Sequence, residues 1–240
     1  MAGRPAYPLA RYSYFIFALI IAALVVAGFS QTFSARLLHP PSPRPPIIYF
    51  HVAVFASWVI LFMLQTALIA TGNVKLHRKV GVFGFALGVT LVITGVATAI
   101  VSTRAYTQPG HSDPAPFLAV FLNDMIEFSF FFGLAIYWRK KPEFHRRLMF
   151  IATCTLMSAA TIRLLPTSLN SPDKWIYVGV DALILLGWAR DWIVNKRIHL
   201  VFLYGLPAAL LGQLIALYLD LSGSSVWLTI AHRLIASPFL

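Results

Sequence analysis

The chain has 240 residues, of which 59% are hydrophobic and 11% are charged, and its mean hydropathy is +0.77. In a typical soluble domain about a quarter of the residues are charged, so this composition excludes a single soluble core and predicts a polytopic membrane protein. A formal net charge of +11 would suggest nucleic acid for a soluble protein, but here the basic residues fall in short loops. That placement indicates membrane topology and no nucleic-acid partner.

Seven apolar stretches of about 20 residues or more are long enough to cross a hydrocarbon core of about 30 Å. We expect seven transmembrane helices over residues 12–36, 47–72, 80–103, 117–138, 146–166, 175–194 and 199–220. Little chain remains between them, so the sequence predicts one all-α transmembrane domain over 1–240, a seven-helix bundle in a lipid bilayer. The tail 226–240 is too short to span and is predicted to be an interfacial helix.

Lysine and arginine are unevenly divided between the two ends of this predicted bundle. The side with the N-terminus and the loops after the second, fourth and sixth helices holds thirteen of them, and the opposite side holds six. The positive-inside rule therefore places the N-terminus in the cytoplasm and the C-terminus outside.

Five ionisable side chains fall in the outer halves of four predicted helices. In chain order they are His51, Asp124, Glu127, Arg163 and Asp181. Asn123 borders Glu127 on one helix face, and Thr161 lies next to Arg163. Each such group costs about 2.5–3.5 kcal/mol in hydrocarbon, so we expect these side chains to face one another or a wet cavity.

Three carboxylates facing one arginine and one histidine leave at least one negative charge unbalanced. Either a carboxyl is protonated, because burial disfavours its charged form, or a bound cation completes the site. A metal site of His51, Asp124, Glu127 and Asp181 would suit zinc, manganese or iron. In an enzyme the cation would activate water for hydrolysis of a lipid-phase substrate. Asp124 and Glu127 would then act as acid and base, with Arg163 as the counter-charge.

Two other interpretations stay open. The same charges could hold the helices together or pass protons, in a proton path or a non-catalytic subunit beside other membrane subunits. Alternatively, His77, His145 and His199 begin three helices at the inner face and could hold a b-type haem, which needs two imidazoles at matching depth.

Two short boxes at predicted helix starts resemble a group of uncharacterised bacterial membrane proteins. LHRKVG (76–81) and FHRRLM (144–149) look like the HRRLG- and HRRLM-type boxes that open transmembrane helices in that group. DPAPFL, the Asn123-Asp124 pair and Arg163 extend the resemblance over about residues 47–166. The resemblance implies an all-helical bundle in the bacterial inner (plasma) membrane, and it implies no activity.

Overall fold

A computed structural model of the chain describes residues 8–34, 38–40, 43–107, 112–166 and 172–237. Within these ranges every regular element is helical. The elements are α1 (Pro8–Phe33), α2 (Pro46–Ala70), α3 (Val74–Tyr106), α4 (Leu118–Tyr137), α5 (Pro142–Thr155), α6 (Ser158–Thr161), η2 (Ile162–Leu164), η3 (Pro172–Trp175), α7 (Val178–Asn195), α8 (Leu200–Leu221) and α9 (Ser225–Ala236). The predicted all-α fold is confirmed.

Several of these helices are long and apolar enough to cross a membrane. Within the described ranges five qualify singly, namely α1, α2, α3, α4 and α8, and α5 with α6–η2 forms a sixth when the bent pair is counted as one span. The 18-residue α7 is not among them, because it carries Asp181, Arg190 and Asp191. The chain is therefore a multi-pass helical membrane protein, while the seven-span count stays a prediction.

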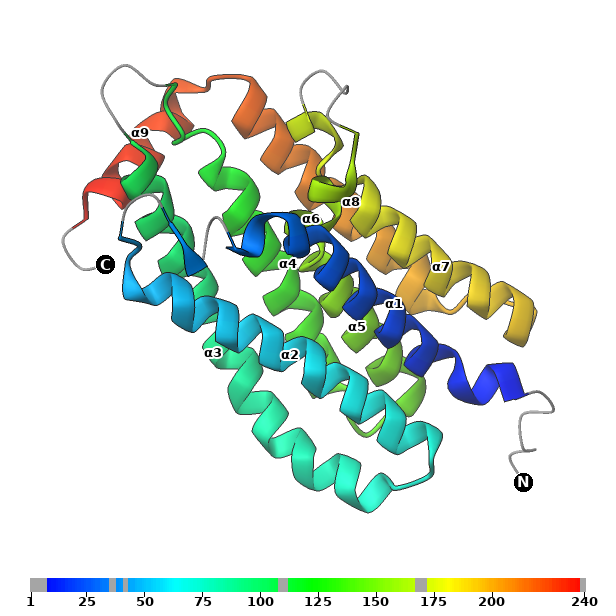
Figure 1. The fold of residues 1–240 in the computed structure, drawn as a ribbon. Coiled ribbons are helices and arrows are strands. Elements are labelled where there is room, and N and C mark those ends of the chain that lie inside the picture. The colour runs from blue at the N-terminus through cyan, green and yellow to red at the C-terminus, as the bar shows by residue number, and fades with distance from the viewer. Residues whose placement is uncertain (1–7, 35–37, 41–42, 108–111, 167–171, 238–240) are drawn as a thin grey trace.

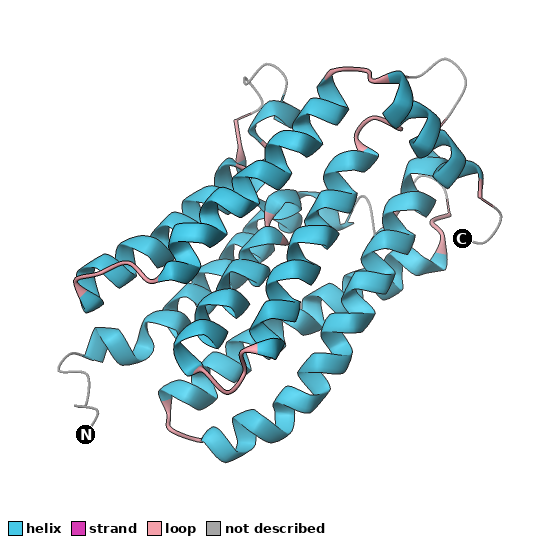
Figure 2. Cartoon of the chain, turned by 180° about the vertical axis from the view of Figure 1, so that it is seen from behind, coloured by secondary structure: helices cyan, strands magenta, loops and turns pink. Residues whose placement is uncertain are grey.

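The helices form a bundle with α4 in its interior. Figure 1 shows α1, α2 and α3 side by side along one face, with α4 and α5 behind them. On its other sides α4 packs against α5 and α8, and α7 closes the bundle against α5 and α8. Seen from behind, most connections are short loops at the two ends of the bundle (Figure 2).

The sequence marks several helix ends with recognisable signals. Proline occupies the first position of α2 at Pro46 and of α5 at Pro142, where its missing N–H costs nothing. Asn73 caps α3, accepting a hydrogen bond from the Leu76 N–H at 3.2 Å. At the other end of a helix, Lys196 adopts a left-handed conformation (φ 53°) that stops α7.

The predicted continuous helix over 146–166 is wrong at its middle. The backbone breaks after Thr155, and the segments on either side are bent by 47°. At the break the Met157 N–H donates to the Cys154 carbonyl at 2.9 Å, which is a tight turn, and the Thr155 hydroxyl donates to the Ala152 carbonyl at 2.9 Å. Such side-chain bonds to the backbone compete with helical pairing. The bend turns α6 toward α1 and α7.

The predicted interfacial tail forms α9, which packs on the far end of α3. Ala231 and Ile235 are buried against Ala99 and Leu118. The Trp227 indole N–H donates to the Pro116 carbonyl at 3.1 Å. The tail is therefore a helix docked on the bundle, and its place in the membrane interface stays a prediction.

Candidate functional site

The polar residues of α4 lie in the bundle interior. Asn123, Asp124 and Glu127 are only 8%, 7% and 5% exposed. The Asn123 side-chain amide donates to Glu127 Oε1 at 2.9 Å and to the Tyr177 hydroxyl at 3.2 Å. The Ser158 hydroxyl, at the start of α6, donates to Asp124 Oδ2. The bend between α5 and α6 thus places a hydroxyl against a buried carboxyl.

Helices α7 and α8 complete this group. Asp181 of α7 lies close enough to Glu127 for their charges to interact, and Gln213 of α8 lies beside Asp181. Gly212 allows α8 to approach, since a Cβ there would lie 2.7 Å from Glu127 Oε1 and 2.9 Å from Asn123 Oδ1. We call this group the carboxyl cluster; its members are Asn123, Asp124, Glu127, Ser158, Tyr177, Asp181 and Gln213.

The carboxyl cluster has no counter-charge among the described residues. No ion pair joins Asp124, Glu127 or Asp181 to a lysine, arginine or histidine that the structure describes. One oxygen of each carboxyl is also buried without a hydrogen-bond partner within that part of the chain, as is Nε2 of Gln213. Asp124 and Glu127 are buried and Asp181 is half-buried, so three negative charges here would repel one another, and this arrangement favours protonated carboxyls or a bound ligand.

The other residues predicted for this site lie elsewhere or face away. The half-buried His51 ring packs on Phe55, with 4.1 Å between ring centroids, and its buried Nδ1 has no hydrogen-bond partner among the residues that the structure describes. Arg163 donates to the Ala159 carbonyl, and its guanidinium lies 4.5 Å from the Phe29 ring centroid. Thr161 is buried, and its hydroxyl donates to the Met157 carbonyl.

These placements bear on the metal prediction. Among the residues that the structure describes, no three histidine, cysteine, aspartate or glutamate side chains are grouped so that they could hold a metal ion. The structure therefore does not bring His51, Asp124, Glu127 and Asp181 together as ligands. Arg163 contacts the Phe29 ring of α1 and the Ala159 carbonyl, and its predicted role as the counter-charge stays a prediction.

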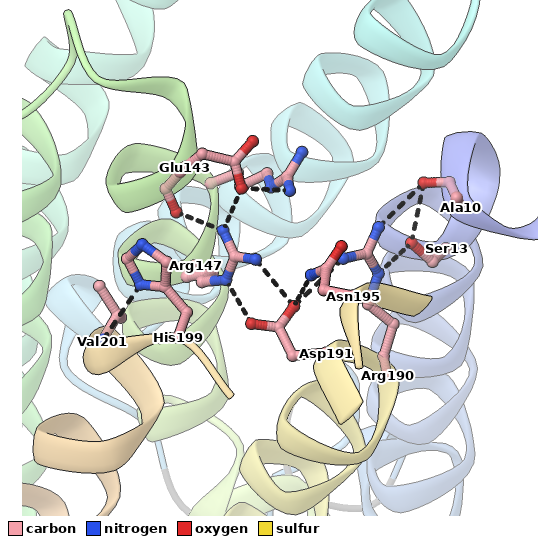
Figure 3. A network of polar contacts seen from close by, with 10 residues as sticks. Ala10, Ser13, Glu143, Arg147, Arg190, Asp191, Asn195, His199 and Val201 are labelled. Atoms are coloured by element: carbon pink, nitrogen blue, oxygen red, sulfur yellow. Dashed lines mark hydrogen bonds and ion pairs between the residues drawn. The ribbon is translucent and has the colours of Figure 1, made fainter. Parts of the chain in front are cut away.

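A second polar network, which the sequence analysis did not predict, ties the ends of α5 and α7 together (Figure 3). Arg147 binds Asp191 with two bonds, Nε to Oδ2 at 2.6 Å and Nη2 to Oδ1 at 2.9 Å. Both side chains are buried, at 2% and 0% exposed. Arg190 and Asn195 also donate to Asp191 Oδ1, at 3.1 and 3.0 Å.

The network reaches α1 and α8. Arg190 donates to the Ser13 hydroxyl at 2.9 Å and to the Ala10 carbonyl at 3.0 Å, which fastens the start of α1. His199 caps α8, because its Nδ1 accepts from the Val201 N–H at 3.2 Å. Burial, and then the positive charge of Arg147, lower the pKa of His199, so this ring is neutral near neutral pH and can act as that acceptor.

Two of the three histidines of the haem prediction meet. The rings of His77 and His145 lie 6.3 Å apart between centroids, and the His145 Nδ1 lies 2.9 Å from the Ala135 carbonyl. With the Gln65 amide in the orientation that satisfies its neighbours, its nitrogen donates to His77 Nδ1 at 2.7 Å. His199 packs instead on Phe144, at 4.7 Å between centroids. The structure thus pairs His77 with His145 and gives His199 a capping role.

The sequence held a signal for this network. Arg147, Arg190 and Asp191 stand at the ends of predicted spans; the topology count uses only the two arginines, and the prediction gives Asp191 no role. An acid directly beside an arginine at a helix end, with a second arginine on another helix at the same depth, could have predicted the ion pair.

Comparison with known proteins gives no relative. No protein-family model matches the chain, and no curated protein or solved structure matches it. The resemblance of the LHRKVG and FHRRLM boxes to bacterial membrane proteins stays a sequence prediction.

Proposed function

We propose that this multi-pass membrane protein binds and releases protons at its carboxyl cluster, as a proton path or as a proton-coupled subunit of a membrane complex. One observation carries the proposal: three interior carboxyls are grouped without a described basic partner. Ionisable groups inside a membrane domain are costly and typically mark proton relays or ligand sites. A structural salt bridge would instead pair each acid with a base.

The neighbours of the carboxyls suit proton exchange. Hydroxyl groups can both donate and accept, so Ser158 and Tyr177 can serve either protonation state of an adjacent carboxyl. Ser158 contacts Asp124, and Asn123 links Tyr177 to Glu127. Asp181 continues the line toward α7. Small rotations of these hydroxyls and carboxyls let a proton reach and leave each carboxyl, whereas the Asn123 amide only orients Tyr177 and Glu127 and does not carry a proton.

The finer topology forms part of the same proposal. Counting α7 as the seventh span, with the N-terminus in the cytoplasm, agrees with the distribution of basic residues at the two ends. The bacterial inner membrane rests on the resemblance of the helix-start boxes. With this orientation the carboxyl cluster lies in the outer half of the bilayer.

Proton flux into proteoliposomes tests the proposal. The purified chain is reconstituted with a pH-sensitive dye in the lumen, and a membrane potential is imposed. Asp124→Asn and Glu127→Gln should lower the flux to that of protein-free vesicles, while the exposed Asp113→Asn should leave it unchanged. Both cluster variants should keep the circular dichroism and the stability of the wild type, because an amide has the size and the neutrality of a protonated carboxyl.

Two results would overturn the proposal. One is a wild-type flux no larger than that of empty vesicles, or one that the two cluster variants leave intact. The other is stoichiometric zinc, manganese or iron in the purified protein that both variants lose, because a metal site would then replace the proton site.

A further inference from the structure

A basic cleft opens where α5 begins and α7 passes into α8. It has a volume of about 690 Å³ and is lined by Glu143, Phe144, Arg146, Arg147, Asn195, Arg197 and His199. From the charge and the position of this cleft, we infer that it binds the phosphate group of an anionic phospholipid. This inference concerns the opposite end of the bundle from the carboxyl cluster and does not depend on the proposed proton function.

Charge is the first argument. Three arginines line the cleft against one glutamate, and that glutamate is shared: its Oε2 accepts from Arg146 at 2.6 Å and from Arg147 at 2.7 Å. Arg147 is held in place by Asp191, whereas Nε of Arg146 is buried without a partner in the described chain. Arg197 is exposed. The lining therefore keeps a surplus of positive charge and an unused N–H donor.

Donor geometry is the second argument. Because the Nδ1 of His199 accepts the Val201 N–H, its proton resides on Nε2, which makes that nitrogen a donor. The side-chain amide of Asn195 adds a further polar group. Two helices, α5 and α8, also begin beside the cleft, and the positive ends of their dipoles favour an anion.

The level of the cleft in the bilayer decides between a lipid and a soluble anion. The exposed aromatic residues Tyr137, Trp192 and Tyr204 lie at the ends of α4, α7 and α8 that meet here, with 74%, 57% and 68% of their surfaces accessible. Tyrosine and tryptophan gather at the headgroup level of membranes. Phe144 provides an apolar wall beside the arginines. The cleft thus offers a phosphate site at the depth of phospholipid headgroups.

Native mass spectrometry of the full chain in detergent tests this inference, with phosphatidylglycerol and phosphatidylcholine as probes. Phosphatidylglycerol should bind more tightly, and the double variant Arg146→Gln/Arg197→Gln should weaken that binding by about tenfold, since it removes two charge-assisted contacts. The matched control Arg139→Gln/Lys140→Gln removes equal charge from the same end without touching the cleft. It should bind like the wild type.

Three outcomes would overturn the inference. The first is equal binding of the two lipids, and the second is an equal loss in the control variant. The third is displacement of phosphatidylglycerol by millimolar inorganic phosphate, which would assign the cleft to a soluble anion. Arg197→Gln alone should leave folding unchanged, because that side chain is exposed, and it should already weaken phosphatidylglycerol binding.

Discussion

Asp191→Asn should be among the most destabilising conservative substitutions in this protein. Asp191 is fully buried and accepts bonds from Arg147, Arg190 and Asn195. Neutralising it leaves two buried guanidinium groups, with 2% and 7% of their side chains exposed, without the buried carboxylate that they share. Removing one partner of a buried ion pair costs about 3–5 kcal/mol, because the remaining charge stays desolvated.

Two companion variants set the scale. Arg147→Met should cost less, since Asp191 keeps Arg190 and Asn195 as partners. Glu143→Gln should cost only about 0–1 kcal/mol, because the Glu143 side chain is 56% exposed and its bonds to Arg146 and Arg147 are screened.

The free energy of unfolding can be measured for all three variants by titrating sodium dodecyl sulfate into mixed micelles, with circular dichroism as the signal. The expected order of destabilisation is Asp191→Asn, then Arg147→Met, then Glu143→Gln. If Asp191→Asn lowers the free energy of unfolding no more than Glu143→Gln does, then the ion pair between Arg147 and Asp191 does not hold α5 to α7.

Two further predictions concern packing and topology. Gly212→Ala would place a Cβ 2.7 Å from Glu127 Oε1 and should destabilise the protein by about 1–3 kcal/mol. Gly133→Ala is the control, because the space around its Cβ is open, and it should not destabilise the protein. The same unfolding titration measures both variants, and equal stabilities would refute the close approach of α8. In a Cys154→Ser background, Lys140→Cys on intact cells should react with a thiol reagent only after permeabilisation, and labelling by an impermeant reagent from outside would reverse the proposed orientation.

The sequence predicted most helices because their start signals are local. Pro46 and Pro142 begin helices within a few residues of the predicted positions. The other helices are predicted from the lengths of the apolar stretches between polar loops. The break after Thr155 could not be predicted in this way, since no proline or glycine marks it. Its polar partner, Asp124, is more than thirty residues away in the chain.

The carboxyl cluster was predicted in part. The spacing of Asn123, Asp124 and Glu127 on one helix correctly indicated a shared interior face. His51 and Arg163 were joined to them because depth along a helix can be estimated from residue number. Depth, however, does not give the direction in which a side chain points: Arg163 faces α1 and His51 packs on its own helix neighbour. Direction depends on how the helices are rotated against each other, which one sequence does not state.

Asp124 and Asp191 show how the two polar regions differ, although both side chains are buried aspartates. Asp191 lies between two arginines, so its negative charge is needed for the packing of α1, α5 and α7. Asp124 has a hydroxyl partner and one oxygen without a partner in the described part of the chain, so a negative charge there would lack a described counter-ion. We therefore expect replacement by asparagine to have opposite effects at the two sites. If Asp191→Asn loses stability but keeps proton flux, and Asp124→Asn loses flux but keeps stability, then Asp191 has a structural role and Asp124 a role in proton transfer. The reverse pattern would mean that the carboxyl cluster holds the bundle together and that the proton function belongs elsewhere.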